Sequence, residues 1–261
     1  MAPVSGVVVT GAGSGIGRAI AHRLAADGFR VVVNDLDPAA AEAVAGETGG
    51  TAVPGDAASD AGVTALVEQA REVLGQIDVW CGNAGVERGR GLETSEADWA
   101  LGLEVNILAH VRAARLLVPD WVERGHGRFL ITASAAGLLT MLGSPAYSVS
   151  KHGAVAFAEW LSATYRHRGV VVQAVCPQGV RTRMLDEAGA LQDLLAHDRA
   201  LAPEEVADAV REALNHDRFL VLPHPQVAGY YAHRATDPDR WLAGMNRIQQ
   251  RLEGEAPSRF A

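Results

Sequence analysis

The chain has 261 residues, of which 48% are hydrophobic and 21% are charged, as is usual for a soluble globular protein. Its formal net charge of −8 argues against nucleic acid or an anionic membrane as a partner. No apolar run approaches the ~20 residues that cross a bilayer, and no basic segment precedes the first apolar run as in a signal peptide. Both cysteines, Cys81 and Cys176, lie in apolar runs, which is typical of reduced core thiols and predicts a cytoplasmic protein.

Short β-branched runs alternate with amphipathic helical patterns along the chain. The expected strands are residues 4–10, 30–35, 51–55, 77–82, 127–134, 170–176 and 218–222, and the expected helices are 15–27, 38–47, 60–74, 96–123, 146–168 and 203–215. This alternation predicts an α/β fold with a single Rossmann-like, doubly wound parallel sheet of about seven strands and helices on both faces. No linker or repeat divides the chain, so we expect residues 1–261 to form one domain that binds ligands at the carboxyl ends of its strands.

The first strand-to-helix turn, Thr10 to Gly17, is rich in glycine. Glycines at such a turn permit unusual backbone angles and let a pyrophosphate approach the helix N-terminus. The spacing differs from Gly-x-Gly-x-x-Gly, and it is not a Walker loop because Arg18 follows the last glycine in place of Lys-Ser/Thr.

Tyr147 and Lys151 are four residues apart in an expected helix and therefore share one face of it. A nearby ammonium should lower the pKa of the phenol from its usual value of ~10 toward a range useful for acid–base catalysis. Ser134 ends an apolar strand, and a glycine-bearing connection leads from it to this helix. We expect the three side chains to meet.

In this order, the glycine turn, Ser134, Tyr147 and Lys151 resemble the short-chain dehydrogenase/reductase family, with matching motifs from residue 4 to about 182. The resemblance implies an oxidoreductase that transfers a hydride between NAD(H) and a secondary alcohol or ketone. Tyr147 would be the acid–base, Lys151 would lower its pKa and bond the nicotinamide ribose, and Ser134 would orient the substrate oxygen. Asn106 would distort the helix 96–123 and hold a water that relays protons to the lysine. No metal is expected.

Asp35 follows Gly17 by 18 residues and ends the second expected strand. A carboxylate there accepts bonds from the ribose hydroxyls and repels a 2′-phosphate, which favours NAD over NADP. Ser14 and Leu36 supply no cation for that phosphate, and Arg18 is the only nearby candidate. The alternative role for Asp35 is to form the turn at the strand end.

The resemblance extends to other cofactor contacts. It implies that Asp56 contacts the adenine, with turn capping as the alternative, and that Val180 and Thr182 meet the nicotinamide carboxamide. The full set of expected cofactor residues is Gly11, Ser14, Gly15, Ile16, Gly17, Asp35, Leu36, Asp56, Ala57, Asn83, Ala84, Gly85, Tyr147, Lys151, Pro177, Val180 and Thr182.

Two positions depart from the family pattern. Gly82 replaces the first asparagine of Asn-Asn-Ala-Gly, so the sheet centre must be supported by other groups. Gln178 replaces the usual glycine after Pro177, and its amide either bonds a polar group of the substrate or bonds a neighbouring loop. The expected substrate residues are Ser134, Tyr147, Gln178 and Met184. Residues 183–200 are expected to form a substrate lid, or alternatively a surface helix.

The remaining expectations concern assembly and the C-terminus. Helices 96–123 and 146–168 usually make a four-helix dimer contact in the family, although the apolar face of 96–123, with Trp99, Leu103, Ile107, Leu108 and Val111, could equally be core. We expect a homotetramer or homodimer, with Phe157, Trp160 and Leu161 as contact residues. Residues 223–261 are expected to form a helical extension with an apolar stripe of Trp241, Met245, Ile248 and Leu252 after Asp237-Pro238.

Two other functions remain open at this stage. An NADP-dependent biosynthetic ketoreductase of the acyl-carrier-protein or polyketide type would need a basic residue near Ser14 or Leu36. A non-catalytic nucleotide-binding scaffold would commonly lack the tyrosine or the lysine, and this chain keeps both.

Overall fold

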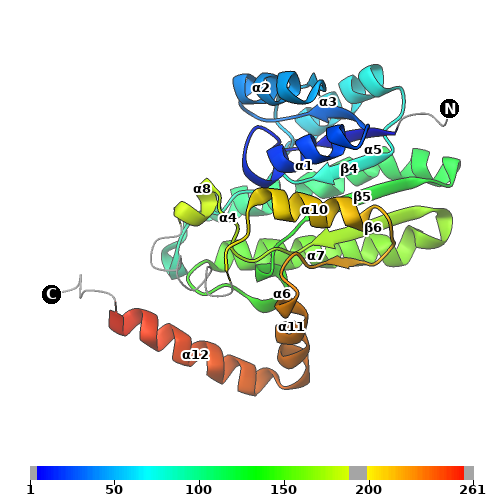
Figure 1. The fold of residues 1–261 in the computed structure, drawn as a ribbon. Coiled ribbons are helices and arrows are strands. Elements are labelled where there is room, and N and C mark those ends of the chain that lie inside the picture. The colour runs from blue at the N-terminus through cyan, green and yellow to red at the C-terminus, as the bar shows by residue number, and fades with distance from the viewer. Residues whose placement is uncertain (1–4, 188–198, 256–261) are drawn as a thin grey trace.

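A computed structural model describes residues 5–187 and 199–255. Its centre is one seven-stranded parallel sheet with the strand order β3-β2-β1-β4-β5-β6-β7, which confirms the predicted fold class (Figure 1). The strands are β1 Gly6–Val9, β2 Arg30–Val33, β3 Thr51–Ala52, β4 Val79–Gly82, β5 Gly127–Thr132, β6 Val170–Val175 and β7 Leu220–Val221. The direction of winding reverses between β1 and β4, so the loops that follow these two strands diverge and leave a crevice.

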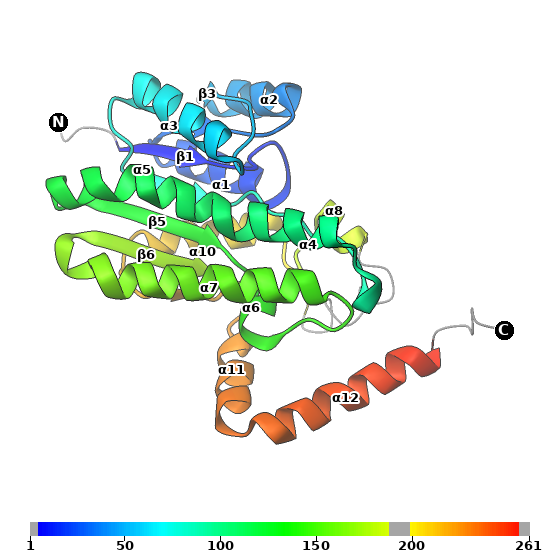
Figure 2. The ribbon, with the colours of Figure 1, turned by 180° about the vertical axis from the view of Figure 1, so that it is seen from behind.

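Each central strand supplies side chains to two separate hydrophobic cores because successive residues of a strand point to opposite faces. In β1, Val7 and Val9 pack on one face and Val8 packs on the other. The first face is covered by α1 Gly15–Ala26, α2 Pro38–Thr48 and α10 Pro203–Ala213, and the second by α3 Asp60–Leu74, α5 Ala109–Arg124 and α7 Pro145–Tyr165 (Figures 1 and 2).

The helix expected at 96–123 is interrupted. It consists of α4 Glu96–Leu103, a π-helical turn η2 Glu104–Leu108 and α5. A π turn breaks the regular ladder of backbone hydrogen bonds and is often found at functional sites. Asn106 lies at its centre, which agrees with the distortion that the family resemblance implies.

One of the three residues that we expected in the dimer contact is buried within the chain. Leu161 is 2% exposed and belongs to the core beneath α7, so its assignment as a contact residue was wrong. Trp160, the preceding residue, is 55% exposed, and Phe157 is half-buried. Helix α7 is apolar on more than one side, and the sequence pattern alone does not tell which side faces the sheet.

Short helical elements complete the fold, namely η1 Gly91–Glu93, α6 Ala136–Leu139, η3 Arg166–Arg168 and α8 Arg183–Asp186. The described part of the C-terminal extension consists of α11 Gln226–Thr236 and α12 Pro238–Glu255, and α12 projects away from the sheet (Figures 1 and 2). Of the expected lid, only residues 183–187 and 199–200 are described, and Leu191, Leu194 and Leu195 lie outside the described residues. Within the described ranges, no helix combines the length and apolar character that crossing a membrane requires.

Candidate active site

A cleft of about 2990 Å³ lies at the carboxyl ends of β1, β2, β4, β5 and β6. This exceeds the ~300–1,000 Å³ of most small-molecule pockets, so it has room for a dinucleotide and a substrate together. The cleft is lined by all of the expected cofactor and substrate residues apart from Gly17, and the fully buried Asn106 bonds Val86, one of the lining residues. The structure therefore brings the predicted residues together around one cavity.

The glycine turn is packed closely enough to require glycine. A Cβ atom at Gly17 would lie 2.1 Å from the carbonyl oxygen of Gly11, and one at Gly13 would lie 2.8 Å from Oδ2 of Asp35. Ser14 precedes α1 without capping it through its side chain, and the first turn of α1 contains no acidic residue. This helix N-terminus keeps its backbone donors for an anion, and the cradle fits the pyrophosphate of a dinucleotide.

Asp35 lines the cleft where β2 ends. Its Oδ2 accepts a hydrogen bond from the backbone N–H of Gly13 at 2.8 Å, and its Oδ1 accepts one from the N–H of Asp37 at 3.1 Å. The turn-forming role is thus present, and each carboxylate oxygen retains capacity for a further donor. Arg18, the expected candidate cation for a 2′-phosphate, instead pairs with Glu47 at 2.9 Å.

Asp56 forms a turn, the role that was the alternative to an adenine contact. Its Oδ1 accepts from the N–H of Ala58 at 2.8 Å and its Oδ2 from the N–H of Ser59 at 3.1 Å, just before α3 begins. The residue is exposed on the cleft wall, so the adenine contact stays a prediction.

The loop after β4 is held by Thr10, a residue that the sequence analysis did not single out. The Oγ1 of Thr10 accepts from the backbone N–H groups of Asn83 and Ala84, each at 3.0 Å. The amide of Asn83 donates to the carbonyl oxygens of Thr10 and Gly11 at 3.1 and 3.2 Å. These bonds lock the loop against the glycine turn across the crevice.

His110 explains why the asparagine of the family pattern is replaced by Gly82. A Cβ atom at Gly82 would lie 2.7 Å from Nδ1 of His110, so the imidazole on α5 fills the space that a side chain at this position would take. His110 is 3% exposed, and its Nε2 has no hydrogen-bond partner among the described residues. Burial is the largest cause that lowers its pKa to about 3, with a smaller contribution from the charge of Lys151, so the ring is neutral.

Asn106 is fully buried and clamps the loop after β4 to helix α7. Its Oδ1 accepts from the N–H of Val86, and its Nδ2 donates to the carbonyl of Val86 and to Oγ of Ser150, each at 2.9 Å. Both amide donors are therefore used within the protein. A relay water would have to bond the second lone pair of Oδ1 or a backbone carbonyl that the π turn leaves without its usual donor.

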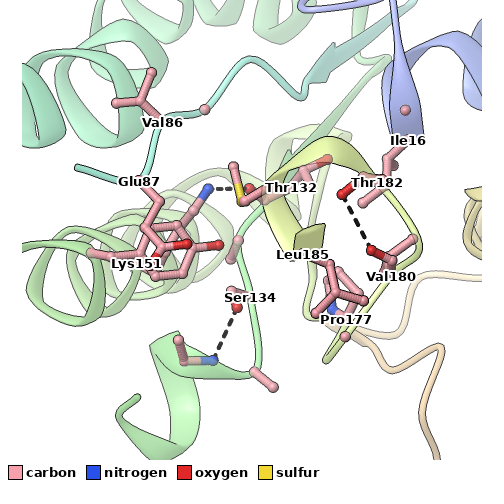
Figure 3. A pocket seen from close by; sticks show the side chains of 18 of the residues that line it. Ile16, Val86, Glu87, Thr132, Ser134, Lys151, Pro177, Val180, Thr182 and Leu185 are labelled. Atoms are coloured by element: carbon pink, nitrogen blue, oxygen red, sulfur yellow. Dashed lines mark hydrogen bonds between the residues drawn. The ribbon is translucent and has the colours of Figure 1, made fainter. Parts of the chain in front are cut away.

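Tyr147, Ser134 and Lys151 all line the cleft, and Figure 3 shows Ser134 and Lys151 among the side chains of its wall. Tyr147 and Ser134 interact through their hydroxyls. The Nζ of Lys151 donates to the carbonyl oxygen of Thr132 at 2.8 Å and lies 5.7 Å from the centroid of the Tyr147 ring. The spacing of the sequence motif thus yields the expected cluster.

The pKa of Tyr147 in the structure differs from the lowered pKa that the sequence motif predicts. Burial raises the pKa of Tyr147 to about 12, opposed by the hydrogen bond with Ser134 and reinforced by the charges of Glu87 and Cys176. Burial also lowers the pKa of Lys151 to about 8. The expected lowering of the phenol pKa by Lys151 is not found in the protein alone: Lys151 is not among the causes that shift this pKa, and its ammonium donates to the carbonyl oxygen of Thr132.

The loop after β6 lies beside the glycine turn. The methyl group of Thr182 lies 3.2 Å from the Cβ position of Gly15, and its Oγ1 donates to the carbonyl of Val180 at 3.2 Å (Figure 3). Gln178 lines the cleft and also accepts a 3.4 Å hydrogen bond from Nε2 of Gln226 on α11. Both roles considered for Gln178 are thus compatible with its place. Met184 on α8 is partly exposed at the rim.

Part of the cleft wall could not be read from motifs. The wall also includes the apolar stripe of α12, with Trp241, Met245 and Ile248, and Glu87 in the loop after β4. The helical spacing of the stripe indicated a helix but not which surface it would face. No sequence motif indicated Glu87, which lies two residues after Gly85.

A glycine-lined helix N-terminus, an acidic residue at the end of β2 and a buried Ser-Tyr-Lys cluster on one parallel sheet define a dinucleotide-binding oxidoreductase site. A family model described as short chain dehydrogenase matches residues 5–193. The 1-deoxy-11-beta-hydroxypentalenate dehydrogenase of Streptomyces exfoliatus is 40% identical over 228 residues, which cover 82% of this chain and 81% of that protein. Oxidoreductase UcpA of Escherichia coli K12 is 30% identical over 249 residues, covering 92% and 91%.

Solved structures agree with this assignment. A short chain dehydrogenase/reductase from Burkholderia phymatum in complex with NAD superimposes with a TM-score of 0.82 at 30% identity, covering 90% of this chain and 94% of that one. A 3-ketoacyl-(acyl-carrier-protein) reductase from Brucella melitensis complexed with NADH gives a TM-score of 0.78 at 27% identity, covering 84% and 94%. The chain belongs to the short-chain dehydrogenase/reductase family and is an oxidoreductase that acts on hydroxyl or keto groups.

Proposed function

We propose that the protein is an NAD-dependent dehydrogenase or ketone reductase that interconverts a secondary alcohol and a ketone. The observation that carries the proposal is the meeting of Ser134, Tyr147 and Lys151 beside the glycine turn and Asp35 in one cleft. Support for NAD over NADP comes from the carboxylate of Asp35 at the end of β2 and from the pairing of Arg18 with Glu47. When bound, NAD supplies the hydride acceptor and NADH the hydride donor.

The roles of the chain's own residues follow from their positions. Tyr147 takes the proton of the alcohol during oxidation and returns it during reduction. Ser134 holds the substrate oxygen beside that hydroxyl, and Lys151, whose pKa burial lowers to about 8, bonds the nicotinamide ribose and passes protons onward. Asn106 fixes the loop after β4 and α7 relative to one another through three hydrogen bonds.

The body of the substrate is proposed to be bulky and apolar. Besides Ser134 and Tyr147, the cleft is lined by the apolar side chains of Leu139, Met141, Leu142, Leu185, Trp241, Met245 and Ile248. Apolar lining of this kind stabilises an apolar ligand in proportion to the surface removed from water. The relative from Streptomyces exfoliatus is by its name a dehydrogenase of a hydroxylated pentalenate, which is consistent with such a substrate.

A 3-ketoacyl thioester is the second candidate, favoured by the structural likeness to the Brucella melitensis reductase. One experiment separates the two. The protein is incubated with NAD or NADP and a panel of apolar cyclic secondary alcohols, and with NADH or NADPH and a 3-ketoacyl thioester, while the absorbance of the reduced nicotinamide is followed. We expect turnover with NAD and a cyclic alcohol. Turnover confined to NADPH and the thioester would replace this proposal with the second, and no turnover on either arm would leave the scaffold function.

We also propose that the protein assembles as a homodimer or homotetramer through α4, η2 and α7. These elements carry Leu103, Leu108, Val149 and Trp160 as exposed apolar side chains. These three elements contact one another, and exposed apolar side chains on neighbouring elements favour an interaction site in soluble proteins.

A further inference from the structure

Glu87 is a nearly buried carboxylate on the wall of the cleft, in the loop that follows β4. Its side chain is only 7% exposed. The Oε1 atom accepts from Nη1 of Arg90 at 2.6 Å and from Oγ of Ser144 at 2.7 Å, and Arg90 also donates to Oγ of Ser144 at 2.9 Å. These bonds fix the orientation of the carboxylate, and no step of the proposed reaction uses them.

Only one oxygen of this carboxylate is bonded within the described part of the chain. No described residue donates to Oε2 of Glu87, and this atom is not one of the polar atoms that are fully enclosed without a partner. Oε2 is therefore reached from the cleft that Glu87 lines, and Figure 3 shows this side chain on the cleft wall. An ionised carboxylate oxygen only accepts hydrogen bonds, so the wall presents an acceptor to a ligand.

Both ends of this short segment are fixed close to the Ser-Tyr-Lys cluster. A Cβ atom at Gly85, two residues before Glu87, would lie 3.3 Å from Nζ of Lys151. Ser144, which bonds Oε1 of Glu87, comes three residues before Tyr147 and immediately before α7. Because two residues of extended chain span at most ~7 Å, a substrate of one or two rings held at Tyr147 can reach the carboxylate.

An entirely apolar substrate would match this part of the wall poorly. A ligand that fills the cleft removes water from Oε2 of Glu87, and an acceptor left without water or another donor costs free energy. A hydroxyl group of the ligand would restore the lost hydrogen bond. Because the guanidinium of Arg90 opposes the charge of Glu87 at 2.6 Å, an uncharged donor is favoured over an ammonium.

We propose that Glu87 is a specificity-determining residue whose Oε2 accepts a hydrogen bond from a second hydroxyl group of the substrate. The substrate class is then an apolar cyclic alcohol or ketone that carries one hydroxyl besides the group reacting at Tyr147. The inference rests on the proposed function for the reaction itself. The preference for a second hydroxyl does not, because it can be measured as binding without turnover.

The test compares ligands that differ in one hydrogen-bond donor. Dissociation constants of 2- and 4-hydroxycyclohexanone and of their methoxy analogues are measured by protein fluorescence in the presence of NAD, which carries no hydride for the ketone. A methoxy group keeps the oxygen and removes the donor. The wild type should bind at least one hydroxyketone roughly 10- to 100-fold more tightly than its methoxy analogue. Glu93→Gln removes an exposed carboxylate outside the cleft and should leave this ratio unchanged.

Glu87→Gln separates recognition from a structural role. Arg90 only donates, so the variant's amide oxygen should face Arg90 and its amino group should face the cleft. The amino group can donate to a hydroxyl or a methoxy oxygen, so the ratio should fall to near one. A purely structural role for Glu87 would weaken both ligands by the same factor and leave the ratio as in the wild type. If Glu87→Gln does not fold, Glu87→Asp, which withdraws the carboxylate from the cleft, should lower the ratio in its place.

Turnover gives an independent measurement. With NADH, the ratio of kcat/KM for each hydroxyketone and its methoxy analogue should change in Glu87→Gln as the ratio of affinities does. A wild-type ratio near one, no measurable binding of either hydroxyketone, or a ratio that persists in the folded Glu87 variants would overturn the proposal. Absence of turnover in the wild type, with the binding preference present and dependent on Glu87, would instead count against the proposed function alone.

Discussion

The carboxylate of Asp35 and the backbone N–H of Gly13 are joined by a 2.8 Å hydrogen bond that ties the end of β2 to the glycine turn. The bond explains why a side chain at Gly13 is excluded, since its Cβ would lie 2.8 Å from the same oxygen. It also holds a negative charge where the adenosine ribose of a dinucleotide is expected. One residue thus shapes the turn and sets the charge that a cofactor would meet.

Cofactor choice follows from this charge. Asp35→Ala combined with Leu36→Arg removes the carboxylate and adds a cation at an exposed position for a 2′-phosphate. Because a charge-assisted hydrogen bond is worth ~1.5–3 kcal/mol, the ratio of affinities for NADP and NAD should rise by roughly 10- to 100-fold. Titration of both cofactors by protein fluorescence measures this ratio. Glu42→Gln, an exposed carboxylate on α2, is the matched control. A wild-type protein that already prefers NADP would contradict the proposal that Asp35 selects NAD.

Acid sensitivity should arise in part from His110. Its pKa is about 3 in the folded protein and ~6.5 in an unfolded chain, so below pH ~6.5 the unfolded state binds a proton that the folded state does not. The stability that the neutral ring contributes is present above that pH. It is lost at up to about 1.4 kcal/mol per pH unit as the pH falls from ~6.5 toward ~3.

Urea unfolding at several pH values tests this contribution. The free energy of unfolding of His110→Leu should depend less steeply on pH below ~6.5 than that of the wild type. His167→Gln replaces an exposed histidine in η3 and should leave the slope unchanged. Identical slopes for the wild type and His110→Leu would mean that the imidazole becomes charged without cost in the folded protein.

The oligomer should depend on the exposed apolar face of α4, η2 and α7. Trp160 stacks on Phe157 with ring centroids 6.1 Å apart and is 55% exposed. Trp160→Glu would put a charge into a desolvated contact, so light scattering should report a species of 27.5 kDa in place of a dimer or tetramer. Leu92→Glu, at a 98% exposed position on η1, should leave the assembly intact. A monomeric wild type at micromolar concentration would rule out this interface.

Much of the fold could be predicted because strand and helix periodicities alternate clearly, and parallel strands place their carboxyl ends at one edge of the sheet. The same reasoning brought Ser134, Tyr147 and Lys151 together. It failed where the outcome depended on packing between distant segments. Leu161 is core and Trp160 is surface, although they are neighbours on an apolar helix.

Three further features depend on contacts that no local pattern encodes. His110 fills the space above Gly82 across the boundary between α5 and β4. Glu87 meets Ser144, 57 residues later, only because two loops fold over the same cleft. The raised pKa of Tyr147 follows mainly from its burial, whereas the sequence motif drew attention to Lys151.

The most direct test removes one hydroxyl from the cleft, that of Tyr147. With a substrate identified from the panel, kcat/KM of Tyr147→Phe is compared with that of the wild type, and NADH affinity is measured by fluorescence for both. Loss of a general acid–base should lower kcat/KM by roughly 10²–10⁴-fold while NADH affinity stays nearly the same. Tyr165→Phe, the same change at the far end of α7, should have no effect. A Tyr147→Phe enzyme that turns over at the wild-type rate would contradict the assignment of Tyr147 as the acid–base.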